Sequence, residues 1–147
     1  MGFASQVKKV TYSTALDDKI QYVLPNPNVI VKISTGMMFR VVDVREALRL
    51  RKYAIENNLI IKINIIDKCA PWNEFPIQLS IKNGRAEVSD CSDYDISCDI
   101  QTFSQIFIGY TSAMDNLYLN RVQGSKESVL TMDKIFNKSI TFNNDGF

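Results

Sequence analysis

The chain has 147 residues, of which 46% are hydrophobic, 10% aromatic and 22% charged. This balance is typical of a single folded globular domain and excludes disordered and membrane-spanning chains. With 17 Lys and Arg against 16 Asp and Glu, the net charge is +1. Such a charge gives no long-range attraction to phosphate backbones or anionic lipid, so we expect neither nucleic acid nor a membrane as a partner.

Catalytic and metal-binding chemistry is limited by the residues that the chain lacks. It contains no histidine, which excludes a Ser-His-Asp or Cys-His arrangement and a His-based metal site within this chain. Cys69, Cys91 and Cys98 are irregularly spaced and include no close pair of the kind that binds zinc. The glycines are isolated, so no loop is predicted to hold the phosphates of a coenzyme. We expect a reduced, cytoplasmic protein that binds neither a metal nor a cofactor by itself.

The first part of the chain has weak strand character and ends at two prolines. Residues 1–22 alternate only briefly before they turn polar, and we interpret them as a linker or the tail of a preceding structure. Pro25 and Pro27 then bracket Asn26 in a rigid, extended connection. We place the domain proper at residues 23–147.

Two β-rich runs follow, VIVKI at residues 29–33 and MMFRVV at residues 37–42. The sequence Ser-Thr-Gly at 34–36 is a plausible tight turn, so the two runs are predicted to pair as a hairpin. Arg40 interrupts the second run. We expect its side chain to face away from the helices, toward a solvated or inter-domain surface.

The hydrophobic period changes from strand to helix at Asp43. Val44, Ala47 and Leu48 fall on one helical face, and Asp43 with Glu46 three residues later has the layout of a capping box. The pattern predicts a helix that starts at Asp43 and ends near residues 57–58. This helix should cover one face of the sheet.

Four further strands are predicted from alternating apolar residues. The run LIIKINII at 59–66 places its odd-numbered residues on one face. The run FPIQLSIKNGRAEVS contains Asn83-Gly84, the pair that favours a type I′ turn, and predicts a hairpin. In YDISCDI, Ile96, Cys98 and Ile100 share one side, which favours Cys98 as a small buried hydrophobe over a reactive thiol.

The last third of the chain is predicted to be mainly helical. Asp99, Ser112 and Ser125 are candidate N-caps of three helices, and SITF at 139–142 resembles a short closing strand. The inward-facing residues expected for the three helices are, in turn, Ile100, Phe103, Ile106, Phe107 and Tyr110; Leu117, Tyr118 and Val122; and Val129, Met132, Ile135 and Phe136. Antiparallel strands followed by grouped helices indicate an α+β fold, a mainly antiparallel sheet with helices packed on one face.

Two loops are candidate sites. CAPWNEF at 69–75 holds the only Trp beside Asn73 and Glu74; it lines a site or, as we prefer, is a turn pinned by a buried indole. SDCSDYD at 89–95 collects three aspartates, a pattern that suggests calcium. It lacks the Gly and the distal Glu of an EF-hand loop, which favours a solvated connection.

The C-terminal carboxylate of Phe147 is the third candidate. Its ordinary pKa of roughly 3.3–3.7 makes it a weak base in water. An aromatic last residue in an apolar pocket would desolvate this carboxylate, raise its pKa and hold it within reach of a proton. The alternative is a frayed polar tail, which is the commoner fate of a chain end.

Taken together, MMFRVVDVREAL, APWNE, LSIKNGRAEVS, IFIGYTSAMDNLYLNRVQG and the final Phe resemble one known family. They are similar to the C-terminal domain of the Eis (enhanced intracellular survival) family of GNAT-type N-acetyltransferases, a domain that itself resembles sterol carrier protein type two. The likeness covers roughly residues 23–147 in the order and spacing of that family. It implies that residues 1–22 are the tail of a preceding acetyltransferase-like domain, or a linker.

The resemblance implies a three-part enzyme of which this chain is the accessory part. Acetyl-CoA and the amine substrate would bind in the missing acetyltransferase domains, which are the expected partners, and the protein would form a homo-oligomer. By position, Phe147 would supply the C-terminal carboxylate proposed in the family as the base that accepts the amine proton. The family's general-acid tyrosine belongs to the missing part, so no tyrosine of this chain inherits that role. Two alternatives stay open, a free-standing carrier of a sterol-like or lipid-like ligand and a purely structural oligomerisation domain.

Overall fold

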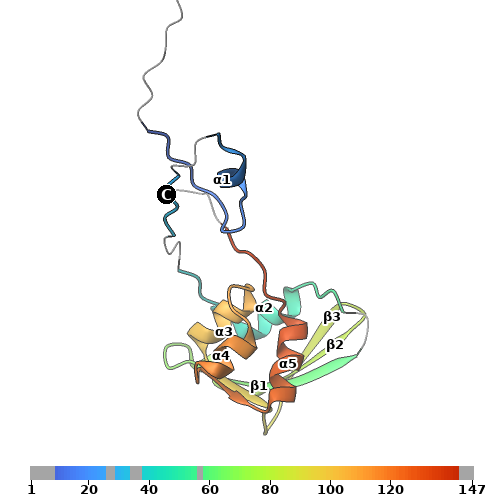
Figure 1. Cartoon of the computed structure of the whole chain (residues 1–147). Coiled ribbons are helices and arrows are strands. Elements are labelled where there is room, and N and C mark those ends of the chain that lie inside the picture. Colours follow the sequence, from blue (N-terminus) through green and yellow to red (C-terminus); the bar gives the residue numbers. More distant parts are fainter. Residues whose placement is uncertain (1–8, 26–28, 34–37, 56–57, 143–147) are drawn as a thin grey trace, which may run out of the picture. The chain divides into compact units, whose positions relative to one another are not determined.

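The computed structural model describes residues 9–25, 29–33, 38–55 and 58–142. The chain divides into two compact units, one of residues Met38–Ser139 and one that combines Met1–Met37 with Ile140–Phe147. In the described part of the second unit, the regular element is α1 (Ile20–Val23), a single helical turn (Figure 1). The larger unit holds the sheet and the remaining helices.

The larger unit contains short strands and helices. In chain order its elements are α2 (Val44–Leu50), β1 (Leu59–Ile66), the 3₁₀ turn η1 (Pro71–Asn73), β2 (Ile77–Lys82), β3 (Arg85–Asp90), β4 (Ile96–Asp99), α3 (Ile100–Phe107), α4 (Ala113–Tyr118), β5 (Val122–Gly124) and α5 (Lys126–Ile135). This order confirms the predicted α+β class.

The described strands form a five-stranded sheet in the order β3-β2-β1-β4-β5. β1 pairs with β2, β2 with β3 and β4 with β5 in antiparallel fashion, whereas β1 and β4 run parallel, with Ile63 opposite Ile96. The sheet is therefore mixed rather than purely antiparallel. The parallel pair arises because the chain leaves β3 at the sheet edge and returns on the far side of β1.

Alternating burial shows which face of the sheet carries the core. Ile61, Ile63 and Ile65 of β1 are buried, while Ile60 and Ile66 are exposed on the opposite face. β2 repeats the pattern with buried Ile77, Leu79 and Ile81 between half-buried Gln78 and Ser80. Helices α2, α3, α4 and α5 lie on one side of the sheet (Figure 1), as the apolar alternation predicts.

The β2–β3 hairpin turns through Asn83 and Gly84, as predicted. Their φ angles of 50° and 74° are the two positive values that a type I′ turn needs. The turn is also bonded from outside, because Tyr53 N donates to Gly84 O and Gly84 N donates to Ile55 O. The segment after α2 is thereby tied to the hairpin.

All four predicted N-caps of the larger unit are confirmed. The side chains of Asp43, Asp99, Ser112 and Ser125 each accept a hydrogen bond from the backbone N–H three residues later. At α4 the capping box is complete, because Asp115 also accepts from the backbone of Ser112. The caps fix where the helices begin on the sheet.

Aromatic rings fill the space between the helices and the sheet. The Phe136 ring lies 5.9 Å from those of Phe103 and Phe107 and 6.5 Å from that of Tyr53, measured between centroids. The Arg51 guanidinium stacks over the Phe107 ring at 4.9 Å and donates to the Phe107 carbonyl. Burial raises the pKa of Tyr53 to about 12, against the opposing effect of the Arg51 charge.

The predicted hairpin of residues 29–33 and 37–42 is wrong. Neither 29–33 nor 38–42 is a strand, and the turn residues 34–36 lie outside the described residues. The backbone of 38–42 is bonded to side chains instead: Val41 N donates to Ser104 Oγ, and Val42 O accepts from the Trp72 and Asn73 side chains. Side chains thus occupy the Val41 N–H and the Val42 carbonyl, two groups that a strand would use for ladder bonds.

Helix α2 is shorter than predicted. It ends at Leu50 rather than near residues 57–58, of which 57 lies outside the described residues. Arg51 turns to an extended conformation, with ψ 138°, and its side chain joins the aromatic cluster. The backbone of Tyr53 and Ile55 then forms hydrogen bonds with Gly84 in the hairpin turn, so the chain after Leu50 cannot continue as a helix.

The end of the chain differs from prediction in two more places. Val122 lies in β5 and not on a helix, because Asn120 adopts a left-handed φ of 56° that ends the preceding helix. Tyr118 is correspondingly exposed, and so is Tyr110. Residues 139–142 form no strand; Ser139 N instead donates to Gly109 O.

In the described ranges, no helix is long and apolar enough to cross a bilayer.

Candidate functional site

The densest polar cluster of the larger unit surrounds Asp67, directly after β1. Its carboxylate is 1% exposed and accepts from Arg40 Nη2 at 2.7 and 2.8 Å, from Asn73 Nδ2 at 2.9 Å and from Cys69 N at 3.2 Å. The carboxylate therefore joins three segments: the chain before α2, the end of β1 and the 3₁₀ turn.

Asn73 is the buried residue of the loop 69–75. Its Oδ1 accepts from Val44 N at 3.0 Å, and its Nδ2 donates to Val42 O and to Asp67. Trp72, in contrast, is 54% exposed and donates its indole N–H to Val42 O at 3.0 Å. The expectation that a buried indole pins this turn is wrong; the small amide of Asn73 does so, since it can satisfy three backbone or carboxylate groups at once.

Arg40 is solvated, as expected, but its charge is also paired. Its side chain is 38% exposed, and its guanidinium forms an ion pair with Asp67, a partner that the sequence did not predict. A carboxylate buried to this degree requires a charged partner, and Arg40 is the cation beside it.

The pKa of Asp67 reflects two opposing effects. Burial raises it, but the hydrogen bonds from Asn73, Arg40 and Cys69 N favour the anion, and the net pKa lies below the ordinary value. The carboxylate is thus an acceptor for its neighbours and has no proton to give at neutral pH.

A hollow of about 320 Å³ lies beside this cluster, at the carboxyl ends of the parallel strands β1 and β4. It is lined by Ile66, Asp67, Lys68, Cys69, Asp99, Ile100 and Gln101. Both of its carboxylates are occupied, because Asp67 holds the cluster and Asp99 accepts from Thr102 N at 2.6 Å. Among the described lining residues, neither carboxylate is therefore free to act as the base that activates a nucleophile.

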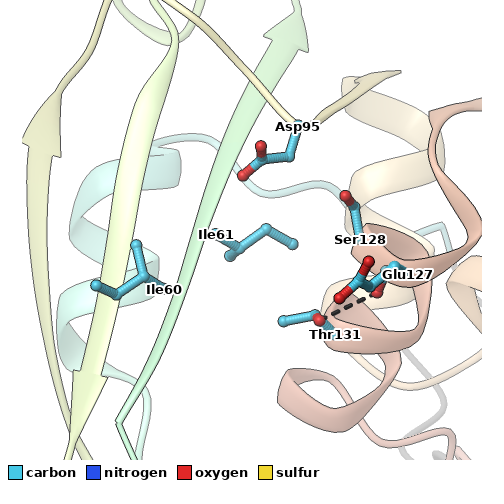
Figure 2. Close-up of a pocket in the computed structure, with 6 residues that line it drawn as sticks. All are labelled: Ile60, Ile61, Asp95, Glu127, Ser128 and Thr131. Carbon is cyan, nitrogen blue, oxygen red and sulfur yellow. Dashed lines mark hydrogen bonds between the residues drawn. The ribbon is translucent and has the colours of Figure 1, made fainter.

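A smaller hollow of about 180 Å³ lies between β1 and α5. Figure 2 shows Ser128 and Thr131 on α5 at one side of it, with Ile61 pointing toward α5 and Ile60 pointing away. Thr131 Oγ1 donates to Glu127 O at 3.1 Å, the bond drawn in Figure 2. This volume is below the roughly 300–1,000 Å³ of typical ligand pockets.

The three aspartates of the loop 89–95 bind different partners. Asp90 pairs with Arg45 at 2.6 Å, Asp93 with Lys62 at 2.7 Å, and Asp95 Oδ2 accepts from Lys62 N at 2.9 Å. Within the described ranges, no three carboxylate or thiol groups come together in a way that would hold a metal ion. These aspartates fasten the loop to α2 and β1.

Cys98 is buried, as predicted. Burial raises the pKa of its thiol to about 12, with a further contribution from the Asp99 charge. It behaves as a small core residue. Phe147, the third candidate, lies outside the described residues.

Sequence reasoning missed Asp67 and the role of Asn73. The available signal was an acidic residue directly after an apolar strand, followed six positions later by an amide in a Pro-containing turn. Asp and Asn are both common in loops, so neither residue indicates a site by itself. Their role becomes visible only in the folded structure, where Arg40 lies beside Asp67.

Comparison with known families decides the identity of the fold. A sterol carrier protein domain family matches residues 44–142. The chain belongs to this family. The matched part runs from the first residue of α2 past the end of α5 and thus includes the whole sheet.

Solved structures resemble this sterol carrier protein domain over most of its length. A probable N-acyltransferase from Enterococcus faecalis, described as a conserved protein of unknown function, is 28% identical with a TM-score of 0.84, over 91% of this chain and 34% of that chain. A GCN5-related N-acetyltransferase from Anabaena variabilis is 20% identical with a TM-score of 0.76, over 86% of this chain and 32% of that chain. Eis1 from Mycobacterium abscessus is 22% identical with a TM-score of 0.61, over 74% of this chain and 27% of that chain.

The last two likenesses, below 25% identity, concern the fold alone. The domain spans about a third of the first two structures that it matches. Among curated proteins there is no match.

Proposed function

We propose that this sterol carrier protein domain is the C-terminal accessory part of an acetyl-CoA-dependent amine N-acetyltransferase of the Eis-like GNAT type. The observation that carries the proposal is the likeness to the Enterococcus faecalis probable N-acyltransferase, which covers 91% of this chain but 34% of that one. The remaining two thirds of a comparable protein would bind acetyl-CoA and the amine. We further propose that the full-length protein is cytoplasmic and forms a homo-oligomer.

The polar groups of the described residues support an accessory role. Asp67, Asn73 and Asp99 are each engaged by backbone or side-chain donors of their own unit, so they stabilise loops and helix ends. The chain also contains no histidine. Acid–base work would therefore fall to groups outside this network.

Exposed apolar side chains in the first unit support contacts with a larger protein. Residues 9–33 hold several large apolar side chains that are mostly in solvent, namely Val10, Tyr12, Leu16, Tyr22, Val23, Ile30, Val31 and Ile33. Soluble monomers rarely expose apolar residues at this density, and such a surface commonly marks an interaction site. The missing acetyltransferase domains are the partner proposed for it.

The chemical contribution proposed for this chain is the C-terminal carboxylate of Phe147. In the intact enzyme it would accept a proton from the substrate amine as the amine nitrogen attacks the acetyl carbonyl. The new bond is N–C, the bond broken is C–S, and the electron pair leaves on the coenzyme A sulfur. A positioned base of this kind contributes about 10²- to 10⁴-fold in rate.

The test is the steady-state kinetics of the full-length protein with and without Phe147. Deletion of Phe147 withdraws the carboxylate by one residue and should lower kcat by about 100-fold or more. Phe147→Ala keeps a carboxylate at the same backbone position but removes the aromatic anchor, so it should lower kcat less than the deletion does. Equal kcat for the deletion variant and the wild type would reject the catalytic part of the proposal.

A second candidate function follows from the family itself, namely carriage of a sterol-like or lipid-like ligand. The apolar layer between the helices and the sheet includes the rings of Phe103, Phe107 and Phe136, which contact one another. A carrier would need an apolar pocket of roughly 300 Å³ or more in that region. Saturable binding of a fluorescent fatty acid to the 147-residue chain would favour this function over the first.

A further inference from the structure

Trp72 is a rigid aromatic side chain on the surface of the larger unit. It is 54% exposed, yet its indole N–H is bonded to Val42 O at 3.0 Å and its carbonyl accepts from Arg45 Nη1 at 2.8 Å. Val42 is itself 63% exposed. The pair forms an apolar surface, here named the Trp72–Val42 surface, whose parts come from the segment before α2 and from η1.

Buried polar contacts hold this surface in place from below. Asn73 bonds Val42 O and Val44 N, the residues on either side of Asp43, and Asp67 holds both Asn73 and Arg40. The backbone beside Trp72 and Val42 is therefore held by Asn73 in addition to the bond from the Trp72 indole. A surface that is already ordered loses little conformational entropy when it binds.

The composition of the surface fits a protein contact. Trp and Arg are the residues most enriched among those that dominate binding energy, and Arg45 lies at the rim, held by Asp90 at 2.6 Å. Trp72 and Val42 are in direct contact through the indole N–H and the Val42 carbonyl. Aromatic residues and Arg are enriched in protein contacts relative to the rest of the surface.

The position of the surface along the chain indicates its occupant. Met38 is the first residue of the larger unit, so Val42 lies four residues after the point at which the chain arrives from its N-terminal side. Any domain that precedes this chain is connected to the surface through residues 1–41 of the same polypeptide, which keeps the domain at a high effective concentration. The domain spans 34% of the Enterococcus faecalis protein, so a comparable full-length protein would contain a large preceding part.

We infer that the Trp72–Val42 surface docks this domain onto the acetyltransferase part of the same polypeptide. The inference rests on the proposed function for the identity of that partner. The contact is intramolecular and places the accessory domain in one orientation. Arg40, Asp67 and Asn73 act as positioning residues for it.

Hydroxyl-radical footprinting of Trp72, read by mass spectrometry, tests this inference in the full-length protein and in the 147-residue chain. In the isolated chain Trp72 should oxidise readily, with exposed Tyr118 as the dose reference. In the full-length protein its oxidation should slow by about tenfold, as expected for a side chain at the centre of a contact. An unchanged oxidation rate would overturn the inference. So would protection that grows with the concentration of the isolated chain, because the occupant would then be a second copy.

A matched pair of variants sharpens the test. Val42→Asp places a carboxylate in the contact and should restore fast oxidation of Trp72 in the full-length protein. Ile60→Asp changes a side chain of similar exposure, 59% against 63%, on the open face of β1 and should leave Trp72 protected. Equal protection in both variants would contradict the docking site.

Acetyl transfer from acetyl-CoA, measured on the same full-length sample, separates the two proposals. Activity with an unprotected Trp72 rejects the docking surface alone. A protected Trp72 without activity rejects the acetyltransferase function and leaves the docking surface standing.

Discussion

Arg40 Nη2 lies 2.7 and 2.8 Å from the two carboxylate oxygens of Asp67, a residue 27 positions further along the chain. This ion pair is part-buried, and Asn73 holds the same carboxylate from a third segment. This contact helps to explain why the segment before α2 joins no strand: the Arg40 side chain and the Val42 carbonyl are both bonded to residues of the loop after β1.

Loss of Arg40 should destabilise the domain more than loss of an exposed ion-pair partner. Arg40→Ala leaves a buried carboxylate without its cation. We expect a loss of about 2 kcal/mol, below the 3–5 kcal/mol of a fully buried pair because the guanidinium edge is screened by solvent. Lys138→Ala removes the cation from exposed Asp115 and should shift the unfolding midpoint much less, because both charges of this pair are solvated. Urea unfolding of both variants checks the difference, and equal midpoints would contradict it.

The contribution of Asp67 should disappear at low pH. Its pKa is lowered in the folded state, whereas the unfolded value is about 3.9, so the folded chain binds fewer protons. The stabilisation is therefore fully present above about pH 5 and is lost as pH falls through the folded pKa. The difference in unfolding free energy between wild type and Asp67→Asn should be constant between about pH 5 and 7 and shrink below about pH 4. A difference that grows on acidification would have the wrong sign.

Gly109 should tolerate no side chain. Its φ is +80°, and a Cβ there would lie 2.6 Å from Ser139 Oγ and 2.8 Å from Asn137 O. Strain and overlap together should make Gly109→Ala destabilising by about 2–3 kcal/mol in thermal or urea unfolding. Addition of Ser139→Gly removes the nearer contact but not the backbone one, so the double variant should recover only part of the loss. Full recovery would place the cost in the side-chain contact alone.

The thiols should differ sharply in reactivity. Cys69 is exposed, whereas Cys98 is buried with a pKa raised to about 12. Since the thiolate is the reactive form, iodoacetamide at neutral pH should alkylate Cys69 in the native protein and leave Cys98 unmodified until the chain unfolds. Peptide mass spectrometry reads both sites in one sample. Comparable labelling of both thiols under native conditions would show that β4 is not buried as described.

Local patterns predicted most of the larger unit. The alternation in 59–66, the Asn83-Gly84 turn and the caps at Asp99, Ser112 and Ser125 depend on neighbouring residues only, and all are present in the structure. The predictions that failed depended on distant partners. Residues 38–42 have strand propensity, but Ser104, Trp72 and Asn73 bond their backbone.

The candidate site shows the same limit. The sequence predicts a buried Trp72 because Trp usually contributes packing area. In the structure the turn buries the side chain of Asn73 instead and leaves that of Trp72 exposed. The partner of Arg40 could not be predicted because Asp67 comes within reach only once β1 and the 3₁₀ turn are in place. The alternative roles of Phe147 remain predictions, since this residue lies outside the described ranges.

The most direct test of the accessory-domain account compares acetyl transfer by two proteins, the 147-residue chain and the full-length protein that contains it. Release of coenzyme A is followed with acetyl-CoA and a panel of primary amines. The account predicts amine-dependent turnover by the full-length protein and none by the 147-residue chain. Turnover by this chain alone at a comparable rate, or a natural protein with no preceding domains, would contradict it.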